Sequence, residues 1–225
     1  MEKIVIVGSG GFGCEVLDLI EMCNKAENIY DPIGFIVDSD YGKAGTLVHD
    51  VPILGDLHWL EKNAKKVKVV VAIGAPHLRF RMVRRLEELN CEFINIIHPW
   101  TKEHLNKWVT LGKGIILNGC QTSNQIHIGN HVFVNAFGVV GHDVTVMDFC
   151  TFGPGVNLDG NVTIGMGCFI GTGSNVLPKV KIGEWSIIGA GSVISKDIPA
   201  NSVAINLPPR IINQMDEGWY LTAEE

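Results

Sequence analysis

Two short segments of the chain bring together residue types that acyl transfer requires. His142, within 141–143, can act as a general base that takes a proton from a nucleophile. Gly160, which lies 18 residues further along within 159–161, can offer a backbone N–H to a carbonyl oxygen as it becomes an oxyanion. The alternative interpretation is a surface histidine that is hydrogen-bonded in a turn. Which of the two applies depends on the elements that position His142.

A six-residue register runs through the segment that contains both residues. From Thr110 to Ile194 every sixth residue falls in one column, in which 13 of 15 positions are apolar and no insertion or deletion is needed. A period of six does not fit a 3.6-residue helix, but it fits short strands separated by sharp corners. With three strands in each coil of 18 residues, the coils stack about 4.8 Å apart. The register therefore predicts that Gly160 lies over His142.

A second column, four residues after each position, supports the same fold because it holds only small or β-branched side chains. Such side chains let the chain pass inside the corners of a triangular prism, whose interior the first column fills. Cys120, Cys150 and Cys168 fall in this second column, where a thiol acts as a compact apolar group. The pattern predicts a parallel β-helix of five coils for this part of the chain.

The first hundred residues alternate strand and helix patterns instead. An apolar strand over 3–7 runs into the glycine loop 8–13, which opens a helix, and two further strands end at Asp38 and Gly74. This order predicts a small parallel sheet, whose ligands bind at the carboxyl ends of the strands. The loop and Asp38 match a dinucleotide fingerprint, but about 95 residues hold too little sheet for a nicotinamide enzyme. A nucleotide-sugar site is the better interpretation, and a tight turn without a ligand is the alternative.

Composition limits the classes of protein to which the chain can belong. A formal net charge of −6 without a stripe of Lys and Arg argues against nucleic acid and against an anionic membrane surface as partners. The six cysteines fit no disulfide or zinc spacing, which indicates a reduced, cytoplasmic setting. No signal-peptide pattern is present, and the longest apolar run, 67–73, is too short to span a bilayer. We therefore expect a soluble protein.

Several motifs are distributed over nearly the whole chain, from Lys3 to about Arg210. They are the glycine loop 8–13, Ala72-Ile-Gly74, Asn95-Ile-Ile-His98-Pro99, Asn135 followed seven residues later by His142-Asp143, Gly160-Asn-Val-Thr-Ile-Gly165, and the segment from Gly171 to Pro178. Together they resemble the bacterial sugar acetyltransferases of the NeuD and PglD type. The resemblance implies an α/β Rossmann-like nucleotide-sugar-binding domain over 1–98, a left-handed parallel β-helix of hexapeptide repeats over 99–210, and a C-terminal tail over 211–225.

The resemblance also implies an activity and an assembly. Members of this family are homotrimers with active sites at subunit interfaces, and they transfer an acetyl group from acetyl-CoA to a sugar without a metal. The expectation for this chain is N-acetylation of a nucleotide-linked amino sugar in surface polysaccharide or glycan biosynthesis. Sugar O-acetylation of the sialic-acid type is the alternative within the family.

Residue roles follow from the resemblance position by position. His142 corresponds to the catalytic base, Asp143 to the acidic neighbour that raises its basicity, and Gly160 to the backbone donor for the thioester carbonyl. Asn135 corresponds to a residue that helps to place the acceptor. The implied coenzyme A contacts are Thr151, Gly160, Thr172 and Ala190, and the implied nucleotide-sugar contacts are Gly10, Gly11, Phe12, Asp38 and Gly74. The family often has His at the positions of Phe12 and Thr151, so these two contacts depart from its pattern.

Two other classes of protein remain as alternatives. A γ-carbonic-anhydrase-like metalloenzyme uses three histidines on the same fold, but His127, His131 and His142 fall at different corners of an 18-residue coil. A non-catalytic scaffold would bind nucleotide sugars without coenzyme A.

The role implied for Asp143 depends on the local backbone. Since neighbours in a regular strand point to opposite faces, Asp143 can support His142 only where the backbone is irregular.

Overall fold

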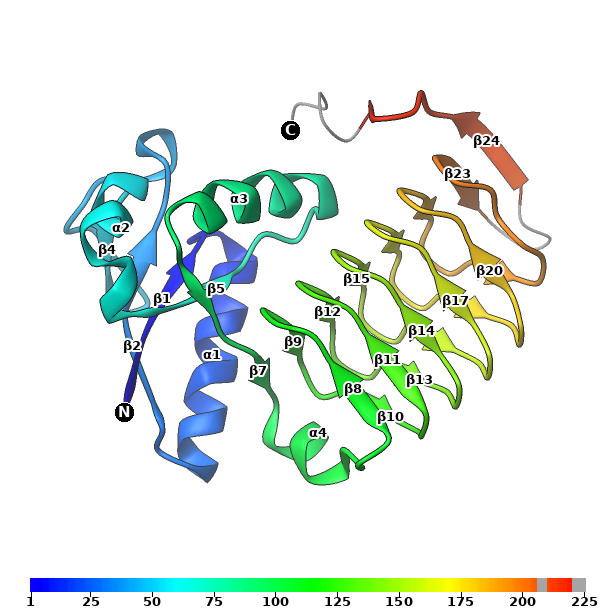
Figure 1. Ribbon diagram of the computed structural model, residues 1–225, viewed down its shortest axis with the longest axis horizontal. Coiled ribbons are helices and arrows are strands. Elements are labelled where there is room, and N and C mark those ends of the chain that lie inside the picture. The colour runs from blue at the N-terminus through cyan, green and yellow to red at the C-terminus, as the bar shows by residue number, and fades with distance from the viewer. Residues whose placement is uncertain (206–209, 220–225) are drawn as a thin grey trace.

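The computed structural model describes residues 1–205 and 210–219 as an α/β domain joined to a triangular prism of short strands (Figure 1). Residues 206–209, near the end of the predicted β-helix domain, and residues 220–225 of the predicted tail lie outside the described residues. Within the described part of the chain, no helix combines the length and the apolar character that crossing a membrane requires.

The N-terminal domain is built on a six-stranded sheet in the order β3-β4-β2-β1-β5-β6. All neighbouring strands are parallel except β3 and β4. The central strands β1 and β5 are runs of Val and Ile that are buried on both faces, as parallel strands usually are. The elements are β1 (Glu2–Val7), α1 (Gly11–Ala26), β2 (Tyr30–Ile36), β3 (Leu47–Val48), β4 (Val51–Gly55), α2 (Leu57–Asn63), β5 (Lys68–Val71), α3 (Pro76–Glu88) and β6 (Glu92–Phe93), with 3-10 turns at Ser39–Tyr41 and Ala64–Lys66.

The prism is built from three sheets. The chain enters it at β7, passes through the short helix α4 (Pro99–His104), and then visits the three sheets in turn. The β7 sheet contains β7 (Ile96–Ile97), β9 (Ile116–Leu117), β12 (Phe133–Val134), β15 (Thr151–Phe152), β18 (Phe169–Ile170), β21 (Ile187–Ile188), β23 (Ser202–Ile205) and the antiparallel β24 (Arg210–Gln214). The β8 sheet contains β8 (Val109–Leu111), β11 (Ile126–Ile128), β14 (Thr145–Val146), β17 (Thr163–Ile164) and β20 (Lys181–Ile182). The β10 sheet contains β10 (Gln121–Thr122), β13 (Val139–Val140), β16 (Asn157–Leu158), β19 (Asn175–Val176) and β22 (Val193–Ile194).

Three corners join these sheets, and each is named here by one residue. The chain turns from the β7 sheet to the β10 sheet at the Asn135 corner, through 135–138 and the equivalent residues of other coils. It turns from the β10 sheet to the β8 sheet at the His142 corner, through 141–144. It returns to the β7 sheet at the Asp148 corner, through 147–150. In a triangular prism, the His142 corner is therefore the edge that lies opposite the β7 sheet.

The predicted register is confirmed from Thr122 to Ile194, where strands pair with the strand 18 residues later. The first coil differs. Leu111 pairs with Ile128 and Leu117 with Val134, so these leucines occupy the column positions predicted for Thr110 and Ile116. The prediction of a register without a deletion is wrong here, because the corner at Gly119, with a φ of 70°, turns with one residue fewer.

The two domains pack together through a shared apolar interface. The rings of Phe12 in α1 and Phe133 in β12 lie 4.2 Å apart, and those of Phe80 in α3 and Phe149 lie 5.1 Å apart. Ile116 packs into the same cluster as the buried face of α1. The N-terminal domain therefore rests on the β7 sheet, where Figure 1 shows α1 beside β7. It also contacts the Asp148 corner, and the His142 corner lies at the opposite edge of the prism.

Candidate active site

The His142 corner holds an imidazole and a carboxylate in direct contact. His142 Nδ1 lies 2.7 Å from Asp143 Oδ2, and the two side chains are 57% and 40% exposed. Adjacent residues can meet in this way because Asp143 has a φ of 59°, in the left-handed region, so the condition of an irregular backbone is met. When the carboxylate holds a proton on Nδ1, the lone pair on Nε2 is free to accept another proton.

Gly160 lies directly against the ring of His142, one coil further along the prism. A Cβ atom at Gly160 would come to 2.5 Å from both Cε1 and Nε2 of the ring, a contact that only glycine avoids. The N–H of Asn161 donates to the carbonyl oxygen of His142 at 2.9 Å, whereas the N–H of Gly160 makes no hydrogen bond to any described residue. The predicted stacking is therefore present, and it leaves a backbone donor beside the imidazole.

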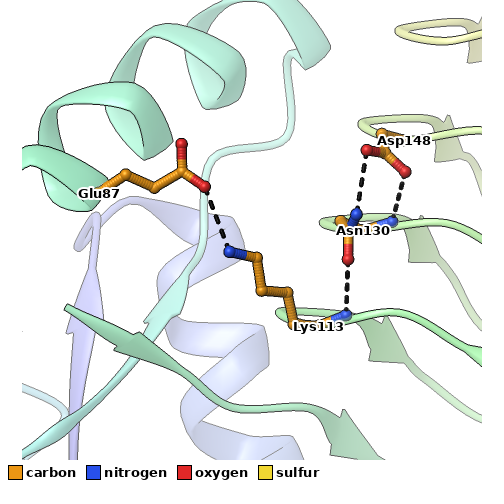
Figure 2. A network of polar contacts seen from close by, with 4 residues as sticks. All are labelled: Glu87, Lys113, Asn130 and Asp148. Carbon is orange, nitrogen blue, oxygen red and sulfur yellow. Dashed lines mark hydrogen bonds and ion pairs between the residues drawn. The ribbon is translucent and has the colours of Figure 1, made fainter. Parts of the chain in front are cut away.

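The Asp148 corner shows what becomes of the equivalent donors elsewhere in the prism (Figure 2). There the N–H of Asn130 donates to Asp148 Oδ1 at 2.7 Å, and the N–H of Lys113 donates to Asn130 Oδ1 at 3.0 Å. A side chain from the next coil thus caps each of these two donors. At the His142 corner the residue one coil beyond Gly160 is Pro178, whose side chain carries no acceptor. The Gly160 N–H therefore stays open to a ligand.

The other residues predicted for acyl transfer lie at a different corner. Asn135 begins the Asn135 corner, at the far end of β13 from His142, where its Oδ1 accepts the N–H of Ala136 at 2.7 Å. Thr172 and Ala190 lie at the same corner on later coils, and both are exposed. A single chain therefore brings His142, Asp143 and Gly160 together, but it does not bring Asn135, Thr172 or Ala190 to them.

Thr151 lies at the domain interface and not on an open surface of the prism. Its side chain is buried, and its hydroxyl donates to the carbonyl oxygen of Gly74 at 2.8 Å and accepts from Arg79 Nη2 at 2.8 Å. The structure places this side chain in the contact between the domains, and its contact with coenzyme A stays a prediction. The hydroxyl instead connects the N-terminal domain to β15.

A pocket of about 720 Å³ opens at the carboxyl ends of β1, β2 and β5, where the order of the strands predicted a ligand. Gly10 and Asp38, two of the predicted nucleotide-sugar contacts, line this pocket. Gly11 is exposed in the first turn of α1. Gly13, the third glycine of the fingerprint, has a packing role, because a Cβ atom there would collide with the carbonyl oxygen of Gly8.

Two of the predicted nucleotide-sugar contacts are occupied by the contact between the domains. The ring of Phe12 packs on Phe133, so its side chain does not line the pocket. The carbonyl oxygen of Gly74 accepts hydrogen bonds from Arg79 and Thr151. The prediction for Phe12 followed the family's position in the glycine loop, and in this chain that position serves the domain interface.

Arg81 and Arg85 line the same pocket from α3, and the prediction from sequence did not include them. Arg85 Nη1 lies 3.9 Å from Asp38 Oδ2. The pocket thus holds positive groups in a chain whose formal net charge is −6. The signal was present in the sequence, because residues four apart on a helix share one face and this helix follows a strand that ends at the predicted site.

The three histidines of the prism lie in separate surroundings. His127 is exposed and its Nδ1 lies 2.9 Å from Thr110 Oγ1. His131 is buried between Phe93 and Phe149, and this burial lowers its pKa to about 4, with the charge of Arg79 adding to the effect. Among the described residues, no group of three or more His, Cys, Asp or Glu side chains is arranged to hold a metal ion.

Both parts of the chain match known family models. Residues 3–86 match the PglD N-terminal domain, and residues 161–196 match the bacterial transferase hexapeptide with six repeats. The chain is also 29% identical over 160 residues to GDP-perosamine N-acetyltransferase from Escherichia coli O157:H7. This alignment covers 71% of this chain and 71% of that protein.

Solved structures resemble the whole molecule. A perosamine N-acetyltransferase from Caulobacter crescentus, with one histidine mutated to asparagine and in complex with CoA and GDP-perosamine, is 29% identical with a TM-score of 0.84, over 95% of this chain and 98% of that chain. The acetyltransferase domain of PglB from Neisseria gonorrhoeae, in complex with acetyl coenzyme A, shares the fold at 23% identity and a TM-score of 0.83, over 94% of this chain and 99% of that chain. The chain thus joins a PglD N-terminal domain to bacterial transferase hexapeptide repeats, and over nearly its whole length it is similar in structure to perosamine N-acetyltransferase.

Proposed function

We propose that the protein is an acetyl-CoA-dependent N-acetyltransferase that acts on a nucleotide-linked amino sugar. The observation that carries the proposal is the His142–Asp143 pair beside the unbonded backbone N–H of Gly160. A base and an oxyanion donor are the two groups that acyl transfer from a thioester to an amine uses. The names of the relatives from Escherichia coli and Caulobacter crescentus, which are perosamine N-acetyltransferases, support an amino sugar as the acceptor.

Acetyl transfer is direct in this proposal. His142 Nε2 takes a proton from the amine as its nitrogen attacks the thioester carbonyl carbon, and the Gly160 N–H donates a hydrogen bond to the oxyanion. The C–S bond then breaks, and the imidazolium gives its proton to the coenzyme A thiolate. Asp143 stabilises the imidazolium through Nδ1 while the proton is held.

A covalent acetyl-enzyme has no part in this mechanism, because a thiol must ionise before it can attack. Burial raises the pKa of Cys120 to about 12, and it raises the pKa of Cys150 well above the ordinary value for a thiol. Both side chains also face the apolar interior of the prism and not the His142 corner. Neither thiol therefore offers a nucleophile to acetyl-CoA.

The nucleotide-linked sugar occupies the N-terminal pocket in this proposal. Backbone N–H groups of Gly10 and Gly11, where α1 begins, receive the diphosphate, as helix N-termini do in dinucleotide-binding proteins. Arg81 and Arg85 add charge-assisted contacts to the phosphates. Asp38 accepts hydrogen bonds from the ribose or the base.

A complete site needs two copies of the chain, and we infer a homotrimer. The pocket-bearing domain rests on the β7 sheet, whereas His142 lies at the opposite edge of the prism. If three prisms turn their β10 sheets toward a common axis, the His142 corner of one copy meets the Asn135 corner of the next. That corner carries Asn135, Thr172 and Ala190, and also Phe137, whose side chain is 83% exposed. Coenzyme A lies between the two corners in this arrangement.

A cytoplasmic location and a role in surface glycan biosynthesis complete the proposal. Six free cysteines fit a reducing compartment. The nucleotide-linked substrate is the activated form in which a sugar is handed to a glycosyltransferase, so acetylation of the amine comes before that transfer.

The test combines substrate turnover with one variant. The purified protein is assayed for coenzyme A release from acetyl-CoA with GDP-, UDP-, dTDP- and CMP-linked amino sugars. At least one of them is expected to be acetylated on nitrogen, as mass spectrometry of the product would show. Loss of general-base assistance predicts that His142→Ala lowers kcat by about 10² to 10⁴ with little change in substrate affinity.

His127→Ala is the matched control, because His127 is an exposed prism histidine away from the His142 corner. It is expected to keep wild-type turnover. Near-normal turnover in His142→Ala would contradict the assignment of the base, and binding of nucleotide sugars without any binding of coenzyme A would favour the non-catalytic scaffold.

A further inference from the structure

Arg79 is a buried cation whose hydrogen bonds, within the described part of the chain, all go to neutral oxygens. Its side chain is 2% exposed, and it makes no ion pair with a described carboxylate. Burial lowers its pKa to about 10, so the guanidinium stays charged at neutral pH. Burying a charge without a counter-ion is unfavourable for stability. Packing alone therefore does not explain why a charged guanidinium is buried at this position.

The hydrogen bonds of Arg79 join the two domains at one point. Nη1 donates to the carbonyl oxygens of Ile73 at 2.6 Å and Gly74 at 3.1 Å, in the loop that follows β5. On the prism side, the acceptors are the carbonyl oxygens of residues 131, 149 and 150 at 2.8 to 3.0 Å, and the Thr151 hydroxyl at 2.8 Å. Since Thr151 also donates to Gly74, the loop is held to the prism by two linked side chains.

This contact fixes the direction of the peptide groups in the loop. In a trans peptide, the C=O of one residue and the N–H of the next point in opposite directions. The carbonyls of Ile73 and Gly74 point at Arg79, so the N–H groups of Gly74 and Ala75 point away from it. Neither N–H makes a hydrogen bond to a described residue. Ile73, whose carbonyl oxygen accepts the shortest of the Arg79 hydrogen bonds, lines the 720 Å³ pocket.

Resting on the proposed function, we infer that Arg79 is a positioning residue for the nucleotide-linked sugar. It fixes the loop of Ile73 and Gly74 between the pocket and the prism, with the loop N–H groups turned outward as donors for the ligand. Arg79 does not touch the ligand itself, because it lies with Val83 and Leu86 on a buried face of α3, whereas Leu78, Arg81, Met82 and Arg85 form the face toward the pocket.

Thr151→Val tests the inference with the smallest change. It removes only the hydroxyl that links Arg79 to Gly74, and it preserves the shape of a β-branched side chain. Loss of one hydrogen bond from the loop is expected to weaken binding of GDP or UDP about fivefold, while coenzyme A binding stays unchanged. Both affinities are measured by calorimetry on the intact protein. Thr163→Val, on the outer face of the β8 sheet, is the matched control and should bind both ligands as the wild type does.

Arg79→Lys and Arg79→Met extend the series. Lysine keeps the charge but not the planar fork, so nucleotide affinity is expected to fall about tenfold, and methionine should lower it further. The KM for the nucleotide sugar should rise by the same factors, and the KM for acetyl-CoA should not change. Faster hydrogen exchange in 72–76 is expected in each variant. Arg84→Met, an exposed position on α3, is the control.

The outcomes separate the inference from the proposed function. If wild-type protein binds a nucleoside diphosphate and folded Thr151→Val binds it equally well, the positioning role is overturned. If Thr151→Val weakens coenzyme A binding instead, Thr151 belongs to the coenzyme A site and the inference is wrong. If the wild type binds coenzyme A but no nucleoside diphosphate, the proposed substrate class itself fails. The Thr151→Val result decides the question even if an Arg79 variant does not fold.

Discussion

Gly160 cannot carry a side chain without displacing the imidazole of His142. A Cβ atom would meet both Cε1 and Nε2 of the ring at 2.5 Å. Its backbone is not in the left-handed region that only glycine adopts easily, so the need for glycine comes from the ring and not from φ. At this scale the site depends on three neighbouring groups, a carboxylate, an imidazole and an N–H, all held by one corner of the prism.

Gly160→Ala is expected to leave the protein folded and to lower turnover. The added methyl group pushes the ring out of line with the substrate amine, so kcat should fall by about 10² or more. Steady-state kinetics measures this effect, and the thermal unfolding midpoint checks that the fold is kept. A variant that turns over like the wild type would show that the ring has room to move and that the close contact is not needed.

Helix α3 serves two purposes through two of its faces. One face packs into the core and the prism through Arg79, Val83 and Leu86. The other lines the pocket with Arg81 and Arg85. The same element therefore connects the pocket of the N-terminal domain to the prism.

Replacing the two pocket arginines is predicted to weaken nucleotide-sugar binding without affecting the chemical step. Arg81→Met and Arg85→Met should each raise the KM for the nucleotide sugar about tenfold, because each loses a charge-assisted contact to phosphate. Salt should lower the wild-type affinity more than that of the variants. The KM for acetyl-CoA is the internal control. Equal loss for both substrates would argue for a general disturbance of α3.

The elements of the prism could be predicted from the sequence because a hexad leaves few alternatives once strands and corners repeat. The first coil could not, since Ile115, Ile116 and Leu117 are all apolar and the pattern does not say which one faces inward. Tertiary contacts determine which side chain faces inward, because Leu117 packs in the prism interior and Ile116 packs against α1. For the same reason, the domain-interface positions of Phe12 and Thr151 could not be read from motifs along the chain.

At the scale of the whole molecule, the predicted site residues divide between two corners of the prism. The stacking of Gly160 on His142 follows from the repeat alone, so the sequence was sufficient to predict it. The separation of Asn135 from His142 is also a consequence of the repeat, because seven residues lead from one corner to the next. What the repeat cannot supply is the relation between copies, which depends on outer surfaces such as the exposed Phe137.

Mixed trimers test whether the site is shared between copies. His142→Ala and Asn135→Ala are expected to be nearly inactive alone. When the two variants are co-expressed and purified together, interfaces that join an intact His142 to an intact Asn135 should form, and about a quarter of wild-type activity should return for random mixing. Separately purified variants, mixed without subunit exchange, are the control. No recovery in verified mixed trimers would mean that both residues act within one chain, and normal activity of Asn135→Ala alone would mean that Asn135 is dispensable.

The open N–H of Gly160 also bears on how such proteins diversify. Stability in this fold comes from the interior column, which is continuous through the prism. Next to Gly160 the following coil presents Pro178, which has no acceptor, whereas at the Asp148 corner it presents Asp148, which caps the N–H of Asn130. A reactive corner can therefore arise by loss of a cap, with the interior unchanged. Surface substitutions at the corner of any coil can therefore create a new reactive site while the fold is kept.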